Sequence, residues 1–227
     1  MSRFDPPVAA QFPVSTGQLG VEWKEDSETE MLRHVWQAYD ALNREGVPAE
    51  VVDDEDAISF RLHNRLQRLV PRESPFVFAH KPPELSTRRG RRSSPPTPDY
   101  GFVLNDEIVF PLEAKLLHNS SHVTKYVNTL RSRYLTGKYA PRSLEGAMVA
   151  YINTWTEDHA FNAIQSKLRR KLEFHVAFQD RSHRISRHER RKLPVGRLKG
   201  EFRCHHLLMR FCDQFQTEMK YATGGAL

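Results

Sequence analysis

The sequence predicts an α/β fold in which helices flank a mixed central β-sheet. Three observations support this class: some segments carry apolar residues at helical spacing, short apolar runs lie between them, and turn residues separate the two. A chain of 227 residues can bury a core without disulfides or a structural metal. We expect residues 1–26 to form a flexible N-terminal arm and residues 27–227 to form a single domain.

Two amphipathic helices are expected first along the chain. The first begins with a capping box, in which Ser27 is the N-cap and Glu30 the third helical residue. The second begins near Asp53 or Asp54, whose carboxylate favours the positive end of a helix, and it ends before Pro71. Both helices should cover the sheet with their apolar sides.

Apolar runs and turn signals predict the remaining elements. We expect strands at residues 76–79, 99–104, 107–116 and 147–152, and helices at 121–135 and 157–172. Toward the C-terminus we favour strands at 174–178 and 184–191, whereas 201–211 fits a strand or a helix equally well. The order of these elements is typical of helices packed on both faces of a sheet.

Charge is distributed unevenly along the chain, whose formal net charge is +6. Residues 1–60 hold thirteen acidic and four basic side chains, and residues 161–203 reverse these numbers. Four further arginines lie close together in a predicted loop: Arg88, Arg89, Arg91 and Arg92. This polarity suits a protein that presents one face to a polyanion such as a nucleic acid. An ordinary basic surface is the alternative.

Apolar runs and cysteine content bear on the cellular compartment. No run approaches the length of about 18 residues that a membrane span needs, so we expect no membrane partner. The first residues lack the apolar core of a secretory signal. The only two cysteines, Cys204 and Cys212, form no disulfide framework, which predicts a cytoplasmic protein.

Potential zinc ligands gather near the C-terminus. They are Cys204, His205, His206 and Cys212, with His183 and His188 nearby. Their spacing lacks the paired ligands of common zinc sites. We therefore favour buried free thiols and surface histidines.

The decisive pattern is Asp99 followed by Glu113-Ala114-Lys115. Residues i and i+2 of a strand project from one face, so Glu113 and Lys115 point the same way. Asp99 lies on the neighbouring strand of the predicted hairpin, within reach of Glu113. Two carboxylates that meet in this way need a cation between them, and Mg²⁺ prefers such oxygen ligands. The alternative is a surface ion pair.

This arrangement sets a condition on the hairpin. Directly paired residues share a face of the sheet. Asp99 and Glu113 can therefore lie on one face only if the residue numbers in each directly paired couple have an even sum, as 99 and 113 do. A two-residue turn at Asn105-Asp106 would give 211, an odd sum, and would place the carboxylates on opposite faces. We therefore predict a three-residue loop from Asn105 to Glu107, or a β-bulge.

Residues 98–115, PDYGFVLNDEIVFPLEAK, resemble the motif of the PD-(D/E)xK nuclease superfamily. The resemblance implies a restriction-endonuclease-like αβββαβ core over about residues 54–152, with a basic C-terminal extension at 153–227. It also implies that Asp99, Glu113 and the Ala114 carbonyl bind Mg²⁺ or Mn²⁺ and that Lys115 is the catalytic lysine. Glu55 on the first core helix best matches a further acidic residue found in many relatives.

The function expected from this resemblance is metal-dependent hydrolysis of DNA phosphodiester bonds, by an endo- or exonuclease. RNA remains an alternative substrate. Small nucleases of this kind occur in bacterial defence and mobile-element systems, which suggests a partner protein or a homodimer. The rival hypothesis is a catalytically inactive nuclease-fold module that binds nucleic acid or scaffolds a complex.

Basic side chains near the motif are candidates for phosphate contact. The predicted helix after Lys115 carries Lys125, Arg131 and Arg133, and in this superfamily that helix often borders the active site. The four loop arginines could clamp the substrate backbone. The alternatives are an ordinary amphipathic helix and a solvated charge run.

Overall fold

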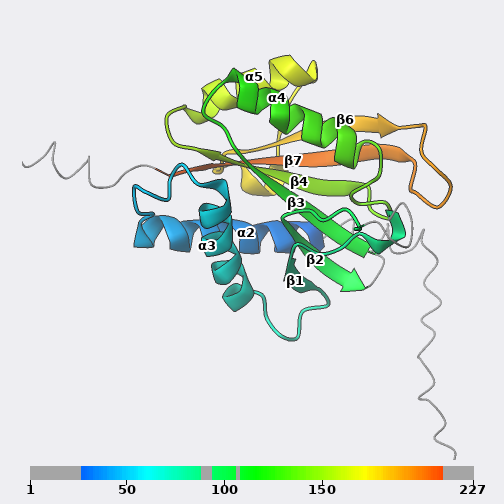
Figure 1. The fold of residues 1–227 in the computed structure, drawn as a ribbon, viewed down its shortest axis with the longest axis horizontal. Coiled ribbons are helices and arrows are strands. Elements are labelled where there is room, and N and C mark those ends of the chain that lie inside the picture. Colours follow the sequence, from blue (N-terminus) through cyan, green and yellow to red (C-terminus); the bar gives the residue numbers. More distant parts are fainter. Residues whose placement is uncertain (1–26, 88–93, 106–107, 212–227) are drawn as a thin grey trace, which may run out of the picture.

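The computed structural model describes residues 27–87, 94–105 and 108–211 (Figure 1). Its strands are β1 (Val77–His80), β2 (Tyr100–Asn105), β3 (Ile108–Leu116), β4 (Glu145–Ile152), β5 (Glu173–Phe174), β6 (His183–Arg190) and β7 (Gly200–Arg210). Its α-helices are α2 (Ser27–Glu45), α3 (Glu55–Leu69), α4 (Ser120–Thr129) and α5 (Glu157–Leu168). The predicted arm at residues 1–26, Cys212, and the loop arginines Arg88, Arg89, Arg91 and Arg92 lie outside the described residues.

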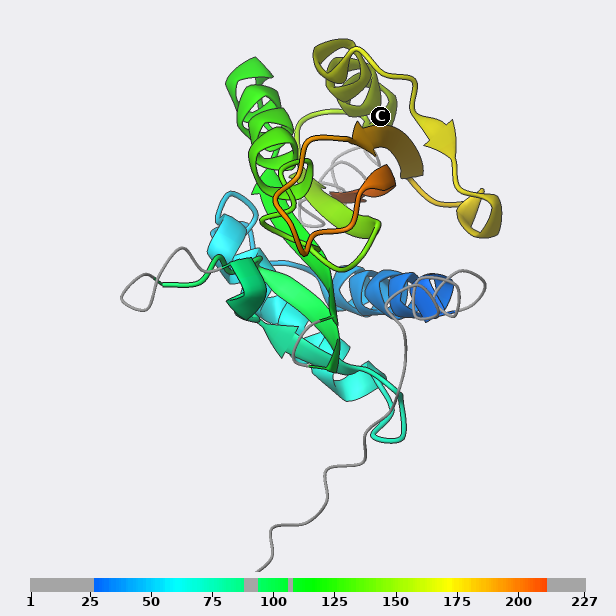
Figure 2. The ribbon, with the colours of Figure 1, turned by 90° about the vertical axis from the view of Figure 1, so that its right-hand side faces the viewer.

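The seven strands form one mixed sheet in the order β1-β2-β3-β4-β7-β6-β5. Helices α2 and α3 cover one face and α4 and α5 cover the other, as the two perpendicular views show (Figures 1 and 2). Side chains of β4 alternate between two apolar cores, with Val149 on the α2 and α3 side and Met148 on the α4 and α5 side. The predicted α/β class, with helices flanking a mixed sheet, is confirmed.

Local sequence signals account for α3. Asp54 is its N-cap, and the Asp54 side chain accepts a hydrogen bond from the Ala57 N–H at 3.0 Å, as predicted for one of the two aspartates. Ile58, Leu62 and Leu66 recur at helical spacing and are fully buried. Within the described residues, no helix combines the length and apolar composition that crossing a membrane requires.

The hairpin of β2 and β3 meets the condition that the sequence set. Tyr100 pairs with Leu112 and Phe102 pairs with Phe110, so the paired numbers have an even sum. The register shifts between Val103 and Asn105, which is the irregularity expected of a bulge. The predicted bulge is therefore present, and it brings the Asp99 end of β2 opposite Glu113.

The described part of the predicted C-terminal extension belongs to the same sheet. β7 pairs in parallel with β4, and β6 pairs antiparallel with β7. The undecided segment 201–211 is thus largely a strand. The strand predicted at 174–178 is wrong in part, because only Glu173–Phe174 pairs with β6 and Val176–Phe178 forms a 3₁₀ turn. Helix α5 ends before the predicted residue 172, because Arg169 adopts a left-handed conformation with φ of 55°.

Two buried polar side chains, Arg190 and Glu84, bind the backbone just before β4. Arg190 is 1% exposed, lies 3.8 Å over the Phe202 ring, and donates to the carbonyls of Ala140 and Ser143 at 2.9 and 2.8 Å. Glu84 is also buried and accepts the Ala140 N–H at 3.1 Å. Burial raises the pKa of Glu84 to about 7, against the opposing effects of the Ala140 N–H and of Arg190.

This pKa predicts a stability that depends on pH. The folded Glu84 pKa of about 7 exceeds the ordinary value of 4.5, so the folded state binds the proton more tightly than the unfolded state does. The contribution of the protonated Glu84 carboxyl to the free energy of unfolding is fully present below pH 4.5 and is lost as pH rises to about 7. We expect Glu84→Gln to gain unfolding free energy relative to wild type over this interval, by about 1–3 kcal/mol.

Urea unfolding at several pH values across this interval measures the difference. Glu50→Gln, which removes an exposed carboxylate, is the matched control and should follow the wild-type pH curve. A constant difference between Glu84→Gln and wild type at all pH values would contradict the prediction.

Candidate active site

The candidate site lies at the end of β3 that β2 leaves uncovered. β2 begins at Tyr100, opposite Leu112, so the last residues of β3 have no strand partner on this edge within the described residues. Backbone groups of alternate residues face the same edge. The Ala114 N–H donates to Asp99 Oδ2 at 2.9 Å, and the Leu116 N–H donates to Glu55 Oε2 at 2.8 Å. Two carboxylates therefore satisfy backbone donors that a neighbouring strand would otherwise pair.

Lys115 lies among the carboxylates. Its Nζ atom is 3.0 Å from Glu55 Oε1, 3.2 Å from Glu113 Oε1 and 3.7 Å from Asp99 Oδ2. The same ammonium donates a hydrogen bond to the Ala114 carbonyl. The structure thus brings together every residue that was predicted for catalysis and metal binding: Glu55, Asp99, Glu113, Ala114 and Lys115.

The elements explain why these side chains meet. Glu113 and Lys115 alternate with the fully buried Ala114 along β3, so both point away from the core beneath α2 and α3. Asp99 comes immediately before β2. Glu55 is the first residue of α3, where the Asp54 cap starts the helix and the positive end of the helix favours a carboxylate.

Burial and charge shift the proton affinities of the site. Burial raises the pKa of Glu113 to about 7, with a further rise from Asp99 and an opposing effect of Lys115. The pKa of Asp99 is also raised, chiefly by burial, although Lys115 and the Ala114 N–H oppose the shift. Burial alone would lower the pKa of Lys115, but Glu113, Asp99 and Glu55 together raise it. Three acidic groups surround a single ammonium, so a further positive charge, such as a cation, would be stabilised here.

Oxygen donors at the site fit a hard divalent cation. Oε2 of Glu113 is buried and has no hydrogen-bond partner among the described residues. A buried carboxylate oxygen without a partner is costly, so it calls for an explanation such as an ion. Asp99, Glu113 and the Ala114 carbonyl would offer only oxygen ligands, which Mg²⁺ prefers.

Two histidines that follow β3 were not singled out from the sequence. His118 lies two residues beyond β3, its Nδ1 is 2.7 Å from Asn153 Oδ1, and its Nε2 is 3.6 Å from Asp53 Oδ1. His122 contacts the His118 ring, and burial, followed by His118 and Lys125, lowers its pKa. Their short distance in sequence from Lys115 was the signal that could have identified them.

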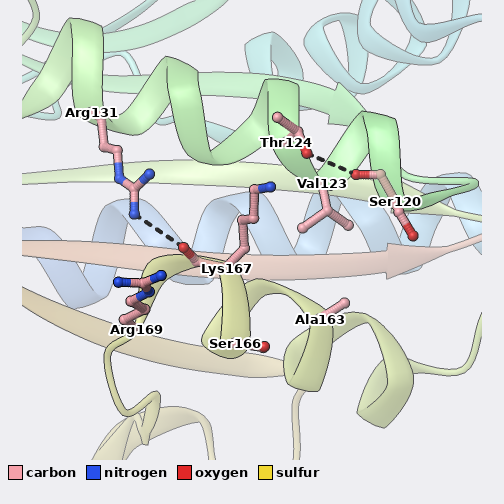
Figure 3. A pocket seen from close by; sticks show the side chains of 8 residues that line it. All are labelled: Ser120, Val123, Thr124, Arg131, Ala163, Ser166, Lys167 and Arg169. Carbon is pink, nitrogen blue, oxygen red and sulfur yellow. Dashed lines mark hydrogen bonds between the residues drawn. The ribbon is translucent and has the colours of Figure 1, made fainter.

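The predicted phosphate-binding residues of α4 and of the turn that continues it lie in different surroundings. Lys125, Arg131 and Arg133 are all exposed, and the last two lie on a π-helical turn, Leu130–Tyr134, that continues α4. Arg133 lines a cavity of about 540 Å³ together with Thr97, two residues before Asp99. Arg131 instead reaches across a separate cavity toward α5 and donates to the Lys167 carbonyl at 3.0 Å (Figure 3). Arg133 therefore shares a cavity with a residue close to Asp99 in the sequence, and Arg131 does not.

Comparisons with known proteins add no assignment. No family model, no curated protein and no solved structure matches this chain. The resemblance of residues 98–115 to the PD-(D/E)xK motif therefore stays a prediction. The functional assignment depends on the geometry and chemistry of the residues described above.

The structure contains a second cluster of potential metal ligands, of which only His205 was named from the sequence. Among the described residues, Glu28, His175 and His205 are the only group of three acidic, histidine or cysteine side chains with ligand atoms all within 4.8 Å of one another. All three are buried, and they could hold a metal ion. The histidines predicted to lie on the surface, His183, His188, His205 and His206, are buried as well, so that prediction is wrong. Cys204 is a buried free thiol, as predicted.

The oxygen-rich site makes a metal-binding prediction. We expect the wild-type chain to bind Mg²⁺ and Asp99→Asn to weaken this binding by roughly tenfold or more, because an anionic ligand is lost. Isothermal titration calorimetry with MgCl₂ measures the difference. Asp180→Asn, which changes a largely exposed aspartate elsewhere, should bind as the wild type does. Equal affinities for Asp99→Asn and wild type would remove Asp99 from the metal site.

Proposed function

We propose that this chain is a Mg²⁺-dependent nuclease that hydrolyses phosphodiester bonds in DNA. One observation carries the proposal: Asp99, Glu113 and Lys115 converge at the open end of β3, with the Glu55 carboxylate and the Ala114 carbonyl beside them. Carboxylates, a carbonyl and a lysine at one point are the groups that metal-assisted phosphodiester hydrolysis uses.

The order of elements supports the same proposal. α3, β1, β2, β3, α4 and β4 follow one another along the chain, with antiparallel pairing from β1 to β3 and parallel pairing of β3 with β4. This order is similar to the αβββαβ core of the PD-(D/E)xK superfamily. By the same association we propose a role in a bacterial defence or mobile-element system, with a partner protein or as a homodimer.

The side chains divide the chemistry among themselves. Asp99, Glu113 and the Ala114 carbonyl would hold the cation, which when bound supplies a polarised water and neutralises charge on the phosphate. Lys115, kept protonated by the surrounding carboxylates, is suited to stabilise the negative charge that develops on the phosphate, rather than to remove a proton from water. Glu55 holds both the Lys115 ammonium and the Leu116 N–H, so it positions the lysine.

Substrate contact is expected on the side of the site where positive charge gathers. Arg133, Lys138 and Arg197 line the cavity that also contains Thr97. Cationic side chains beside a hydrolytic site favour a polyanionic substrate and would hold its phosphates. Such contacts do not distinguish DNA from RNA, so the cleavage experiment includes both polymers.

A second candidate function is a nuclease-fold module that binds nucleic acid without cutting it. The observation that favours it is the ion cluster itself, since Lys115 already neutralises part of the charge of Glu55, Glu113 and Asp99. In this alternative the cluster stabilises the fold and does no chemistry. Binding of DNA without cleavage at any Mg²⁺ concentration would support it.

A lysine substitution tests catalysis directly. We expect Lys115→Met to lower the rate of Mg²⁺-dependent cleavage by about 100-fold or more, because the cation beside the scissile phosphate is lost. The measurement is the cleavage of labelled single-stranded DNA, duplex DNA and RNA of matched sequence, by gel.

The control for this substitution is Lys171→Met, which removes an exposed lysine beyond the end of α5 and should retain the wild-type rate within a few-fold. Circular dichroism and thermal unfolding should show that Lys115→Met is folded. Full Mg²⁺-dependent activity of folded Lys115→Met would contradict the proposed mechanism.

A further inference from the structure

A second group of ligating side chains is buried between α2 and the sheet, away from the candidate active site. We propose that Glu28, His175 and His205 form a binding site for a first-row transition-metal ion and that Zn²⁺ fits this donor set best. Two imidazole nitrogens and a carboxylate oxygen are common zinc ligands, whereas Mg²⁺ prefers oxygen alone. The site shares no residue with the proposed nuclease site and does not depend on it.

The ligands come from separate parts of the fold. Glu28 lies in the first turn of α2, His175 immediately precedes the 3₁₀ turn Val176–Phe178, and His205 lies on β7. Glu145, the first residue of β4, lies next to His205 but does not belong to the group whose ligand atoms all lie within 4.8 Å of one another. A bound ion would therefore tie α2 to β7 and to the chain before β6.

The distances from Glu28 to the two histidines are close to those of a tetrahedral metal site. Glu28 Oε1 is 3.4 Å from His205 Nε2 and 3.6 Å from His175 Nε2, and Glu145 Oε2 is 3.9 Å from His205 Nε2. These separations are too long for good hydrogen bonds. A tetrahedral ion with bonds of about 2.0–2.1 Å separates its ligand atoms by roughly 3.3–3.4 Å. Glu28 is thus placed close to zinc-ligand spacing from both histidines, whereas Glu145 lies farther from His205.

Two of these atoms lack a hydrogen-bond partner. Within the described part of the chain, His205 Nε2 and Glu145 Oε2 are buried and make no hydrogen bond. The guanidinium of Arg203 binds the other oxygens, at 2.9 Å from Glu28 Oε2 and 2.7 Å from Glu145 Oε1. Arg203 therefore fixes both carboxylates with one oxygen each left for the ion.

Hydrogen bonds behind His205 determine its tautomer. The Trp36 Nε1–H donates to His183 Nδ1 at 3.3 Å, so a neutral His183 carries its proton on Nε2, which lies 3.1 Å from His205 Nδ1. His205 then accepts at Nδ1 and carries its own proton on Nε2, the ligand atom. A metal ion on His205 Nε2 displaces this proton, so a neutral His205 carries its proton on Nδ1 and donates it to His183 Nε2. His183 then carries its own proton on Nδ1, where it faces the Trp36 N–H and cannot accept from it.

His175 has a similar competitor. Its Nδ1 accepts the Ala177 N–H at 3.1 Å, which leaves the proton on Nε2. Ligation through Nε2 therefore requires this backbone hydrogen bond to break. The loss of two neutral hydrogen bonds is small beside the bonds that a structural zinc ion makes. The site should bind zinc, and its affinity should be limited by the Trp36 hydrogen bond.

Zinc titration of the full-length chain tests the site. After removal of metal with a chelator, Zn²⁺ is added in competition with a chromogenic chelator, and bound zinc is counted by mass spectrometry. We expect one equivalent that is lost, or weakened at least about 100-fold, in His175→Gln and Glu28→Gln. Asp99→Asn should retain this equivalent, which separates the site from the candidate active site. Absence of stoichiometric zinc in wild type, or its loss in Asp99→Asn alone, would overturn the proposal.

Cobalt gives a readout that needs no substitution. Co²⁺ in the wild-type chain should show the visible absorption of a tetrahedral ion with nitrogen and oxygen ligands, and the band should disappear on addition of Zn²⁺. The exposed-histidine control His159→Gln should show the same band. An octahedral spectrum in wild type would overturn the proposal.

Trp36→Phe tests the tautomer coupling. Without the indole N–H, nothing on that side opposes the metal-bound tautomer of His183, so zinc affinity should rise by roughly tenfold. The chelator competition measures this change, and thermal unfolding without metal shows that the variant is folded. Unchanged or weaker zinc affinity in a folded Trp36→Phe would overturn the coupling.

Discussion

A β-bulge near the tip of the β2–β3 hairpin decides which side chains can meet at the end of β3. Because of the shift between Val103 and Asn105, Tyr100 pairs with Leu112, and Asp99 lies at the uncovered edge of β3, close to Lys115 and opposite Glu113. A hairpin without this shift would turn alternate side chains to the opposite face and separate the carboxylates. The bulge therefore controls the chemistry of a site that begins several residues away from it.

The two candidate metal sites contrast in the way they are built. The site around Lys115 uses oxygen donors at a strand end that is partly open to solvent, where water and a phosphate could enter. The Glu28 site combines nitrogen and oxygen donors in the buried interior, so an ion there would meet no substrate. The parallel register of β3 and β4 places Lys115 opposite Ala150, whereas Glu145 lies at the other end of β4. One protein could thus hold two ions for different purposes.

Much of the fold and of the Lys115 site could be predicted because the signals are local. The Asp54 cap, the strand alternation through Glu113 and Lys115, and the parity of the hairpin each depend on a short stretch of sequence. The histidine cluster could not be predicted in the same way. His205 meets Glu28 and His175 only because β7 pairs with β4 and α2 packs across that region, contacts between residues far apart in the chain. The charge pattern was also misleading, because it suggested that the basic region faces a polyanion, whereas Arg190 of this region is buried against Phe202.

The parallel neighbours β4 and β7 are separated in the chain by α5, β5 and β6. During synthesis, the proposed core through Ile152 therefore leaves the ribosome with one edge of β4 unpaired, and about 50 further residues must follow before β7 can cover it. Pairing over such a sequence separation gives a high contact order and slows folding. Completion of the sheet, and with it the support of the Lys115 site, is thus delayed until β7 has been translated.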